Sequence, residues 1–195
     1  MFKNEIIGYA FTVQLINEVN HKTGLCNAAN YPQLWSYIKP PEQDVSIFLN
    51  TYIQSMIDSH KTGESIAYVV ISNATKQIVG ASRYYEISEL NKKLCIGYTW
   101  YQPDFWGTGI NAEVKYLLLS QIFDHLNWNR VGFHVDTRNS RSLSAMTYLG
   151  AINEGILRKH KIVQGDFVRD TQQFGITNND WPKIKRHLLE RIKQL

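Results

Sequence analysis

The segment from Tyr98 to Ala112, YTWYQPDFWGTGINA, constrains the fold of this chain more than any other stretch. Its aromatic first part is typical of a β-strand, and Gly107 and Gly109 then allow the backbone to turn sharply and to approach a ligand closely. An amphipathic pattern begins directly after Gly109. The segment therefore predicts a strand, a tight turn and a helix in succession, a junction suited to hold phosphate.

The helix after the turn is predicted from its apolar periodicity. Apolar residues recur at helical spacing from Ile110 to Phe123, and Asn111, Lys115 and Asp124 fall mostly between them. The first N–H groups of a helix have no intrahelical partner, and together with the helix dipole they favour an anion such as a pyrophosphate. A pair of glycines can also merely end a strand, so the phosphate site needs support from the rest of the chain.

A second unit of strand, loop and helix follows in VGFHVDTRNSRSLSAMTYLGA. Val131, Phe133 and Val135 alternate with Gly132 and His134, which predicts a strand. A polar turn then leads to an asparagine, residue 139, at the position of a helix cap, and a glycine, residue 150, ends the predicted helix.

The two units together resemble the GNAT superfamily of acyl-CoA-dependent N-acyltransferases, and more closely its branch of ribosomal-protein N-terminal acetyltransferases (RimJ/RimL-like). The matching segments are WGTGIN, NAEVK, RNSRS, LGAINEG, LRKH and GDFVRDT, and the resemblance extends from about Phe11 to the C-terminus. It implies an α/β (α+β) fold, the GNAT fold, with a mixed, mostly antiparallel, splayed sheet of about seven strands flanked by helices. It also implies acetyl-CoA as the cosubstrate.

The resemblance further implies which residues bind coenzyme A. The family's pyrophosphate loop, Gln/Arg-x-x-Gly-x-Gly/Ala, falls on residues 106–111, with Trp106 in place of the Gln or Arg and Asn111 in place of the last small residue. The side chain of Asn111 must then point away from the phosphates or donate to them. The pantetheine arm is expected in the gap of the splayed sheet. The implied cofactor-binding residues are Thr99, Trp100, Tyr101, Trp106, Gly107, Thr108, Gly109, Ile110, Asn111, Asn139 and Ser142.

The resemblance points to Ser142 as the general acid that protonates the departing thiolate, and to Asn139 as a partner of the pantetheine amide or the thiol. The same two residues could instead only cap the helix, because Asn at the N-cap and Ser in the first turn are ordinary. A serine hydroxyl is a poor acid, so loss of Ser142 is expected to slow the reaction modestly.

The general base is not identified by the resemblance. A glutamate of the ribosomal enzymes falls at or near Lys161 here, so its role does not transfer. Glu86 and His160 are substitutes by residue type, and a histidine with its ordinary pKa of about 6.5 suits proton transfer at neutral pH. Each could equally be structural or solvated. Glu113 and Glu154 are expected to support packing.

Composition is consistent with one domain over residues 1–195, because 44% hydrophobic residues supply a full core. A net charge of +4 is too small and too dispersed to indicate nucleic-acid binding. Cys26 and Cys95 lie far apart without the spacing of a zinc site, which predicts free thiols and no metal. The lack of a secretion signal and of a long apolar run predicts a cytoplasmic protein without a membrane span.

The remaining patterns predict the other elements. Strands are expected at 11–16, 65–71, 77–86, 94–101, 130–136, 151–163 and 167–176, and helices at 17–30, 42–60, 110–126, 140–149 and near the C-terminus. Residues 1–10 are expected to be loosely ordered. Trp35 and Tyr37 could contact an acceptor, but aromatic residues in such a setting are more often core.

The sequence thus predicts an acetyl-CoA-dependent N-acetyltransferase that acts on a primary amine, either a protein N-terminus or a small molecule. The alternative is a non-catalytic acyl-CoA-binding regulatory module, for which the missing glutamate leaves room. A nucleotide-binding protein is disfavoured, because no Lys-Ser/Thr follows the glycines and no GxGxxG occurs. The patterns do not identify the acceptor, and a homodimer is expected only because relatives commonly form one.

Overall fold

The computed structural model describes residues 1–194, and its elements follow the predicted order closely. The strands are β1 (Glu5–Ile7), β2 (Phe11–Leu15), β3 (Ile66–Ser72), β4 (Ile78–Ser88), β5 (Lys93–Tyr101), β6 (Arg130–Asp136), β7 (Ile152–Val163) and β8 (Phe167–Thr177). The helices are α1 (Glu18–Ala29), α2 (Val45–Lys61), α3 (Ile110–Ser120), α4 (Ser140–Leu149) and α5 (Trp181–Ile192), with short turns η1 (Pro32–Trp35), η2 (Pro103–Phe105) and η3 (Gln121–His125).

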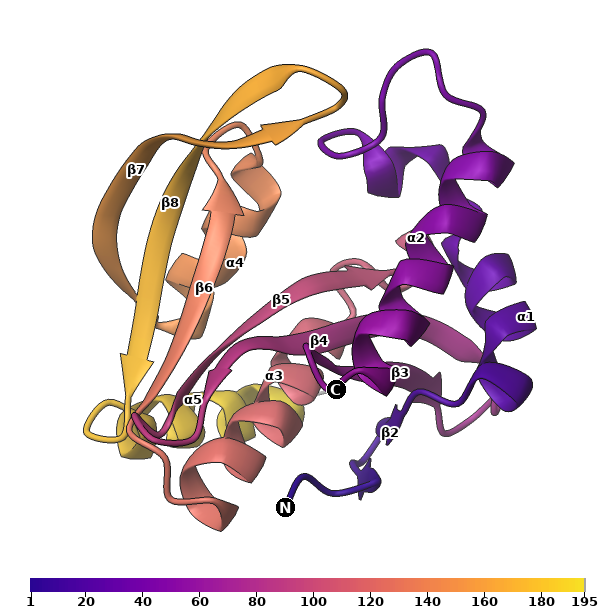
Figure 1. The fold of residues 1–195 in the computed structure, drawn as a ribbon. Coiled ribbons are helices and arrows are strands. Elements are labelled where there is room, and N and C mark those ends of the chain that lie inside the picture. The colour runs from indigo at the N-terminus through magenta and orange to yellow at the C-terminus, as the bar shows by residue number, and fades with distance from the viewer. Residues whose placement is uncertain (195) are drawn as a thin grey trace.

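All eight strands form one sheet in the order β1-β2-β3-β4-β5-β6-β8-β7 (Figure 1). Each neighbouring pair is antiparallel except β5 and β6, which are parallel. Parallel neighbours need a crossover connection, and α3 supplies it between β5 and β6. The predicted mixed, mostly antiparallel sheet is confirmed.

The sheet splays between β5 and β6. These strands pair only from Lys93 to Cys95 and from Arg130 to Gly132, although both continue well beyond. Figure 1 shows the two strands together at their first residues and separating toward their last ones. Among residues 1–194, the backbone of β5 that faces the gap therefore has no strand partner on that side, which leaves its polar groups available to a ligand.

Three irregularities occur within β4, β5 and β7, strands that lie on the two sides of this gap. Register shifts occur where β4 passes Glu86, where β5 passes Tyr98, and where β7 passes Lys159. These three residues have φ values of 51°, 52° and 51°, which side chains other than glycine rarely adopt. A bulge re-aims the side chains around it and is over-represented next to functional sites. Backbone strain is thus present within β4, β5 and β7.

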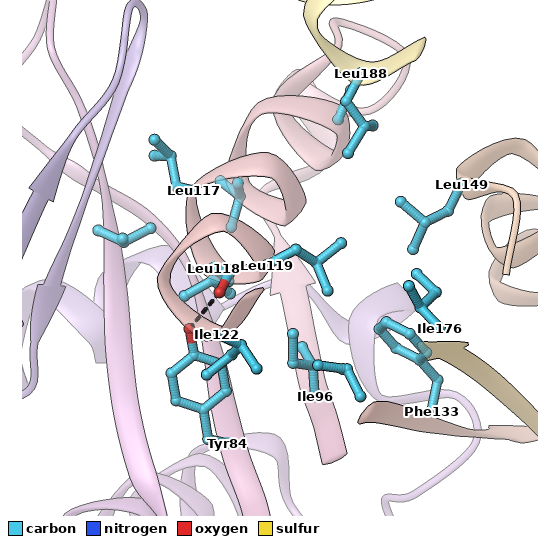
Figure 2. Close-up of a cluster of buried hydrophobic side chains, with 14 of the residues drawn as sticks. Tyr84, Ile96, Leu117, Leu118, Leu119, Ile122, Phe133, Leu149, Ile176 and Leu188 are labelled. Atoms are coloured by element: carbon cyan, nitrogen blue, oxygen red, sulfur yellow. Dashed lines mark hydrogen bonds between the residues drawn. The ribbon is translucent and has the colours of Figure 1, made fainter. Parts of the chain in front are cut away.

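The hydrophobic core lies on both faces of the sheet. On one face, α3 and α5 pack against the centre, and Figure 2 shows Leu117, Leu118 and Leu119 of α3 in one cluster with Tyr84, Ile96, Phe133 and Ile176 of the sheet. The hydroxyl of Tyr84 donates a 2.8 Å hydrogen bond to the carbonyl of Leu118. On the other face, α1 and α2 cover β3 to β5. A buried cluster there includes Trp35, which confirms that residue as core.

The expectation for residues 1–10 is wrong, because part of this segment forms β1 and the sheet has eight strands instead of about seven. The strand is short, so its alternation gives little signal in the sequence. Tertiary contacts hold it: the ring of Phe2 lies 5.3 Å from that of Tyr84. The buried carboxylate of Glu113 accepts hydrogen bonds from the N–H groups of Ala10 and Phe11, which confirms its structural role.

The predicted helix at 110–126 is regular only to Ser120 and continues as the π-helical turn η3. In this turn Gln121 is buried, and its amide donates to the hydroxyls of Tyr68 and Tyr84. None of the helices within residues 1–194 combines the length and the apolar character needed to cross a membrane.

Candidate active site

The glycine loop has the backbone geometry that the sequence predicts. Gly107 and Gly109 have φ values of 79° and 84°, in the left-handed region that favours glycine. A Cβ placed on Gly107 would meet no atom of the described part of the chain within 4 Å, so this side of the loop is open. Both residues are therefore glycine for a conformational reason, and the loop leaves space for a ligand.

The N-terminus of α3 opens onto this loop. Its first intrahelical bonds run from Ala112 and Glu113 to the carbonyl of Gly109, so the N–H groups of Ile110 and Asn111 have no acceptor within the helix. These donors and the helix dipole favour an anion at the loop. The side chain of Asn111 is held against β5, because its oxygen accepts a 3.3 Å hydrogen bond from the hydroxyl of Tyr101.

Trp106 fixes the loop to the end of β5. Its indole N–H donates a 2.9 Å hydrogen bond to the carbonyl of Tyr101. The guanidinium of Arg141, in the first turn of α4, lies 3.7 Å from the centre of the Trp106 ring. This stacking brings a positive charge beside the loop from an element that follows much later in the chain. Sequence reasoning missed Arg141, which stands within the RNSRS segment.

The end of β5 borders the splay with its backbone. The hydroxyl of Thr99 lies 2.8 Å from that of Ser82 on β4 and accepts a 3.0 Å hydrogen bond from Lys115. Trp100 and Tyr101 are buried, and they pair with β4 and not with β6. These side chains anchor the strand, so the backbone edge that faces the gap is the part of residues 99–101 that a ligand can reach.

Asn139 and Ser142 lie together at the start of α4. The side-chain oxygen of Asn139 accepts a 3.0 Å hydrogen bond from the backbone N–H of Ser142, so Asn139 caps the helix. Capping occupies that oxygen and leaves the amide nitrogen of Asn139 for another role. Ser142 is half-buried. The predicted pair of residues is therefore adjacent, and its capping function is present.

Glu86 and His160, the two candidate bases from the sequence, both lie next to a histidine that sequence reasoning missed. This histidine is His134 on β6, whereas Glu86 lies on β4 and His160 on β7. A carboxylate oxygen of Glu86 is 3.8 Å from Nδ1 of His134, and the rings of His134 and His160 are 5.7 Å apart. Nδ1 of each histidine is buried without a hydrogen-bond partner among the described residues. Arg158, Lys159 and Lys161, which flank His160 in the chain, are exposed.

His134 has the position and the neutral state that a proton acceptor requires. It follows Gly132, the last residue of β6 that pairs with β5, by two positions, so it stands where β5 and β6 begin to separate. Burial lowers the pKa of His134 below its ordinary value, although the Glu86 carboxylate opposes this shift. The imidazole is therefore neutral near pH 7. In the sequence, the alternation of His134 with Phe133 and Val135 indicates only that it belongs to a strand.

The Cys95 thiol also faces this cluster and donates a 3.3 Å hydrogen bond to Glu86. Burial raises the pKa of Cys95 to about 12, and the nearby Glu86 adds to this effect. The thiol is thus protonated and is not a nucleophile. Glu154 forms an ion pair with Arg130, and both line one cavity with Glu86, Cys95 and His134, in agreement with the predicted structural role of Glu154.

Comparisons with known proteins agree with this geometry. The acetyltransferase (GNAT) domain family matches residues 15–152. The chain is similar to an uncharacterized N-acetyltransferase, p20, of Bacillus licheniformis, with 26% identity over 158 residues that cover 80% of this chain and 87% of the relative.

Solved structures share the fold. A GCN5-related N-acetyltransferase from Brucella melitensis superposes with a TM-score of 0.85 at 21% identity, over 95% of this chain and 84% of that one. RimJ of Mycobacterium smegmatis, solved in complex with CoA-disulfide, gives a TM-score of 0.77 at 16% identity, over 92% and 88% of the two chains. The GNAT family uses acetyl-CoA, and its members are acyltransferases. The family match over most of the chain shows that this protein belongs to the GNAT family of N-acetyltransferases.

Proposed function

We propose that this protein transfers the acetyl group of acetyl-CoA to a primary amine by direct attack of the amine on the thioester. The observation that carries the proposal is the splay of β5 from β6, which begins beside His134 and opens next to the glycine loop. A cofactor bound at the loop can extend its arm along the free edge of β5. Its reactive end then lies near a proton acceptor.

The residues present fit coenzyme A. The loop offers glycines in the left-handed conformation, free N–H groups at the start of α3, and the charge of Arg141 stacked on Trp106. These features suit a pyrophosphate. The unpaired backbone edge at residues 99–101 suits the amides of pantetheine, and the amide nitrogen of Asn139 is a further donor. A backbone N–H of this edge would polarise the thioester carbonyl.

The acceptor amine must be neutral when it attacks. In the proposed reaction a C–N bond forms, the C–S bond breaks, and the amine proton passes to His134 or to Glu86 beside it. The lowered pKa of His134 keeps the imidazole free to accept this proton at neutral pH. The thiolate of coenzyme A takes a proton from the hydroxyl of Ser142 or from water. Because the groups are held in contact, orientation supplies much of the rate.

The acceptor is a primary amine of a protein N-terminus or of a small molecule. We place the reaction in the cytoplasm, since Cys26 and Cys95 are both free thiols, as is usual in a reducing compartment.

Release of coenzyme A thiol tests the proposal. Purified protein is mixed with acetyl-CoA and either small primary amines or peptides with free N-termini, and thiol is followed with a colorimetric reagent. We expect amine-dependent release that His134→Gln slows about a hundredfold or more. Acetyl-CoA binding with no release for any amine would contradict the proposal and favour the non-catalytic acyl-CoA-binding module.

A further inference from the structure

Three side chains with metal-binding atoms converge on the face of the sheet that carries His134. They are Glu86 from β4, Cys95 from β5 and His134 from β6, and one ligand atom of each lies within 4.8 Å of the others. Sγ of Cys95 is 3.3 Å from one oxygen of Glu86, and Nδ1 of His134 is 3.8 Å from the other. Ligand atoms around a tetrahedral zinc ion are about 3.3–3.8 Å apart, given its bond lengths to N, O and S.

The pairing register of β4 with β5 and of β5 with β6 brings these three side chains together. Cys95 pairs with Gly132 on β6, and His134 stands two residues further along the same face of that strand. A Cβ on Gly132 would lie 2.9 Å from Sγ of Cys95, so glycine there leaves room for the sulfur. The bulge at Glu86 then turns the carboxylate toward the thiol. The cluster therefore results from pairing across three strands, which no spacing along the chain reveals.

His134 has the surroundings of a metal-binding histidine. Its Nδ1 is buried and without a hydrogen-bond partner among residues 1–194, while its Nε2 lies 3.3 Å from the side-chain amide of Gln173, the residue opposite it on β8. Rotation of that amide by half a turn lets the Gln173 oxygen accept a hydrogen bond from Nε2–H. This tautomer leaves Nδ1 free to coordinate, the arrangement that orients most histidine ligands.

The cluster opens into a cavity of about 190 Å³, which these three side chains line together with Gln173. A site with three protein ligands and an open fourth position is one of the ordinary forms of zinc coordination. A thiol, an imidazole and a carboxylate together select Zn²⁺ over Mg²⁺ or Ca²⁺, which prefer oxygen ligands. Binding would release the thiol proton of Cys95 and would relieve the unpartnered state of His134.

We propose that Cys95, His134 and Glu86 bind one Zn²⁺ ion and that the bound ion inhibits acetyl transfer. The inhibitory part rests on the proposed function, because the ion would occupy the two groups that accept the amine proton. The binding part does not depend on that function. The proposed set of three ligands does not include His160, whose ring centre lies 5.7 Å from that of His134.

Titration of the purified protein with Co²⁺ tests the binding, because cobalt coordinated by a thiolate gives a near-ultraviolet charge-transfer band. We expect the band to saturate at one equivalent and Zn²⁺ to displace it. Cys95→Ser should abolish the band, and His134→Gln should weaken Zn²⁺ affinity tenfold or more. Cys26→Ser removes the other thiol, which lies on α1 outside the cluster, and should behave as wild type. Thermal unfolding without metal shows that each variant is folded.

Several results would overturn the site: no cobalt band in wild type, a band that survives in Cys95→Ser, or one that is lost in Cys26→Ser. The inhibition is measured separately, as thiol release with increasing Zn²⁺ relative to the metal-free rate of each variant. We expect loss of turnover at one bound equivalent in wild type and in Cys26→Ser. Full turnover with Zn²⁺ bound would overturn the inhibitory role. The cobalt titration remains decisive for the site even if no amine is acetylated.

Discussion

Nζ of Lys115 donates a 3.0 Å hydrogen bond to Oγ1 of Thr99. The lysine side chain, on α3, is buried against β5, one of the two strands that border the splay. Burial lowers the pKa of Lys115 from 10.5 to about 7. The Thr99 hydroxyl is in turn 2.8 Å from that of Ser82, which continues the contact to β4. A lysine in this environment makes stability depend on pH.

We predict that replacement of Lys115 by Met changes this dependence. Between pH 7 and 10.5 the unfolded chain holds a proton that folded Lys115 has lost, so the stability of wild type rises with pH. Relative to Lys115→Met, the free energy of unfolding should rise by about 1.4 kcal/mol per pH unit within this range. Urea unfolding at several pH values measures it. A difference that stays constant with pH would contradict the burial of an ionisable amine.

A second prediction concerns the glycine loop. Gly107→Ala places a Cβ at φ 79°, which should destabilise the protein by about 1–2 kcal/mol and raise the KM for acetyl-CoA, because the methyl group projects into the open side of the loop. Gly63→Ala is the matched control, since Gly63 has φ 77° and equally open surroundings in the turn after α2. It should lose similar stability with an unchanged KM. A raised KM in both variants, or in neither, would argue against cofactor binding at Gly107.

A third prediction separates the two roles of Asn139. Asn139→Ala removes the cap of α4 and should cost about 1 kcal/mol, whereas Asn139→Asp keeps a capping oxygen but loses the amide nitrogen. If that nitrogen binds the cofactor, both variants raise the KM for acetyl-CoA and only the alanine variant is clearly destabilised. Asn17 caps α1 in the same way, so Asn17→Ala is the control for stability alone. If Asn139→Asp has the KM of wild type for acetyl-CoA, Asn139 caps α4 and does not bind the cofactor.

The pH dependence of catalysis identifies the base. The pKa of His134 is lowered by burial, so kcat/KM should rise with pH through a value below 6.5 and stay high at neutral pH. Glu86 raises that pKa, hence Glu86→Gln should move the ascending limb to lower pH. His134→Gln should remove the limb. If Glu86→Gln removes it and His134→Gln does not, Glu86 is the base.

Much of the fold could be predicted because its signals are local. The aromatic strand, the glycine turn and the helix from Tyr98 onward appear in the structure as β5, the loop and α3. The strand β1 was missed because it is short and is held by Phe2 and Glu113 through contacts that are distant in sequence.

In the candidate site, too, features with a local sequence signal could be predicted, and features that depend on contacts distant in sequence could not. The backbone geometry of the loop could be predicted, because the positive φ values of Gly107 and Gly109 are ones that glycine favours. The cluster around His134 could not, because strands β4, β6 and β7 bring Glu86, His134 and His160 together only by sheet register and bulges. In the sequence Lys115 falls between the apolar positions of the helix, and only the packing of α3 shows that it is buried.

The central claim is that the glycine loop binds acetyl-CoA. Calorimetric titration tests it most directly, with ATP and NAD as comparators and Gly109→Trp as the variant with a blocked loop. We predict micromolar binding of acetyl-CoA that Gly109→Trp abolishes, and much weaker binding of the comparators. No binding of acetyl-CoA, or a preference for ATP or NAD, would contradict the account and remove every assignment built on the loop.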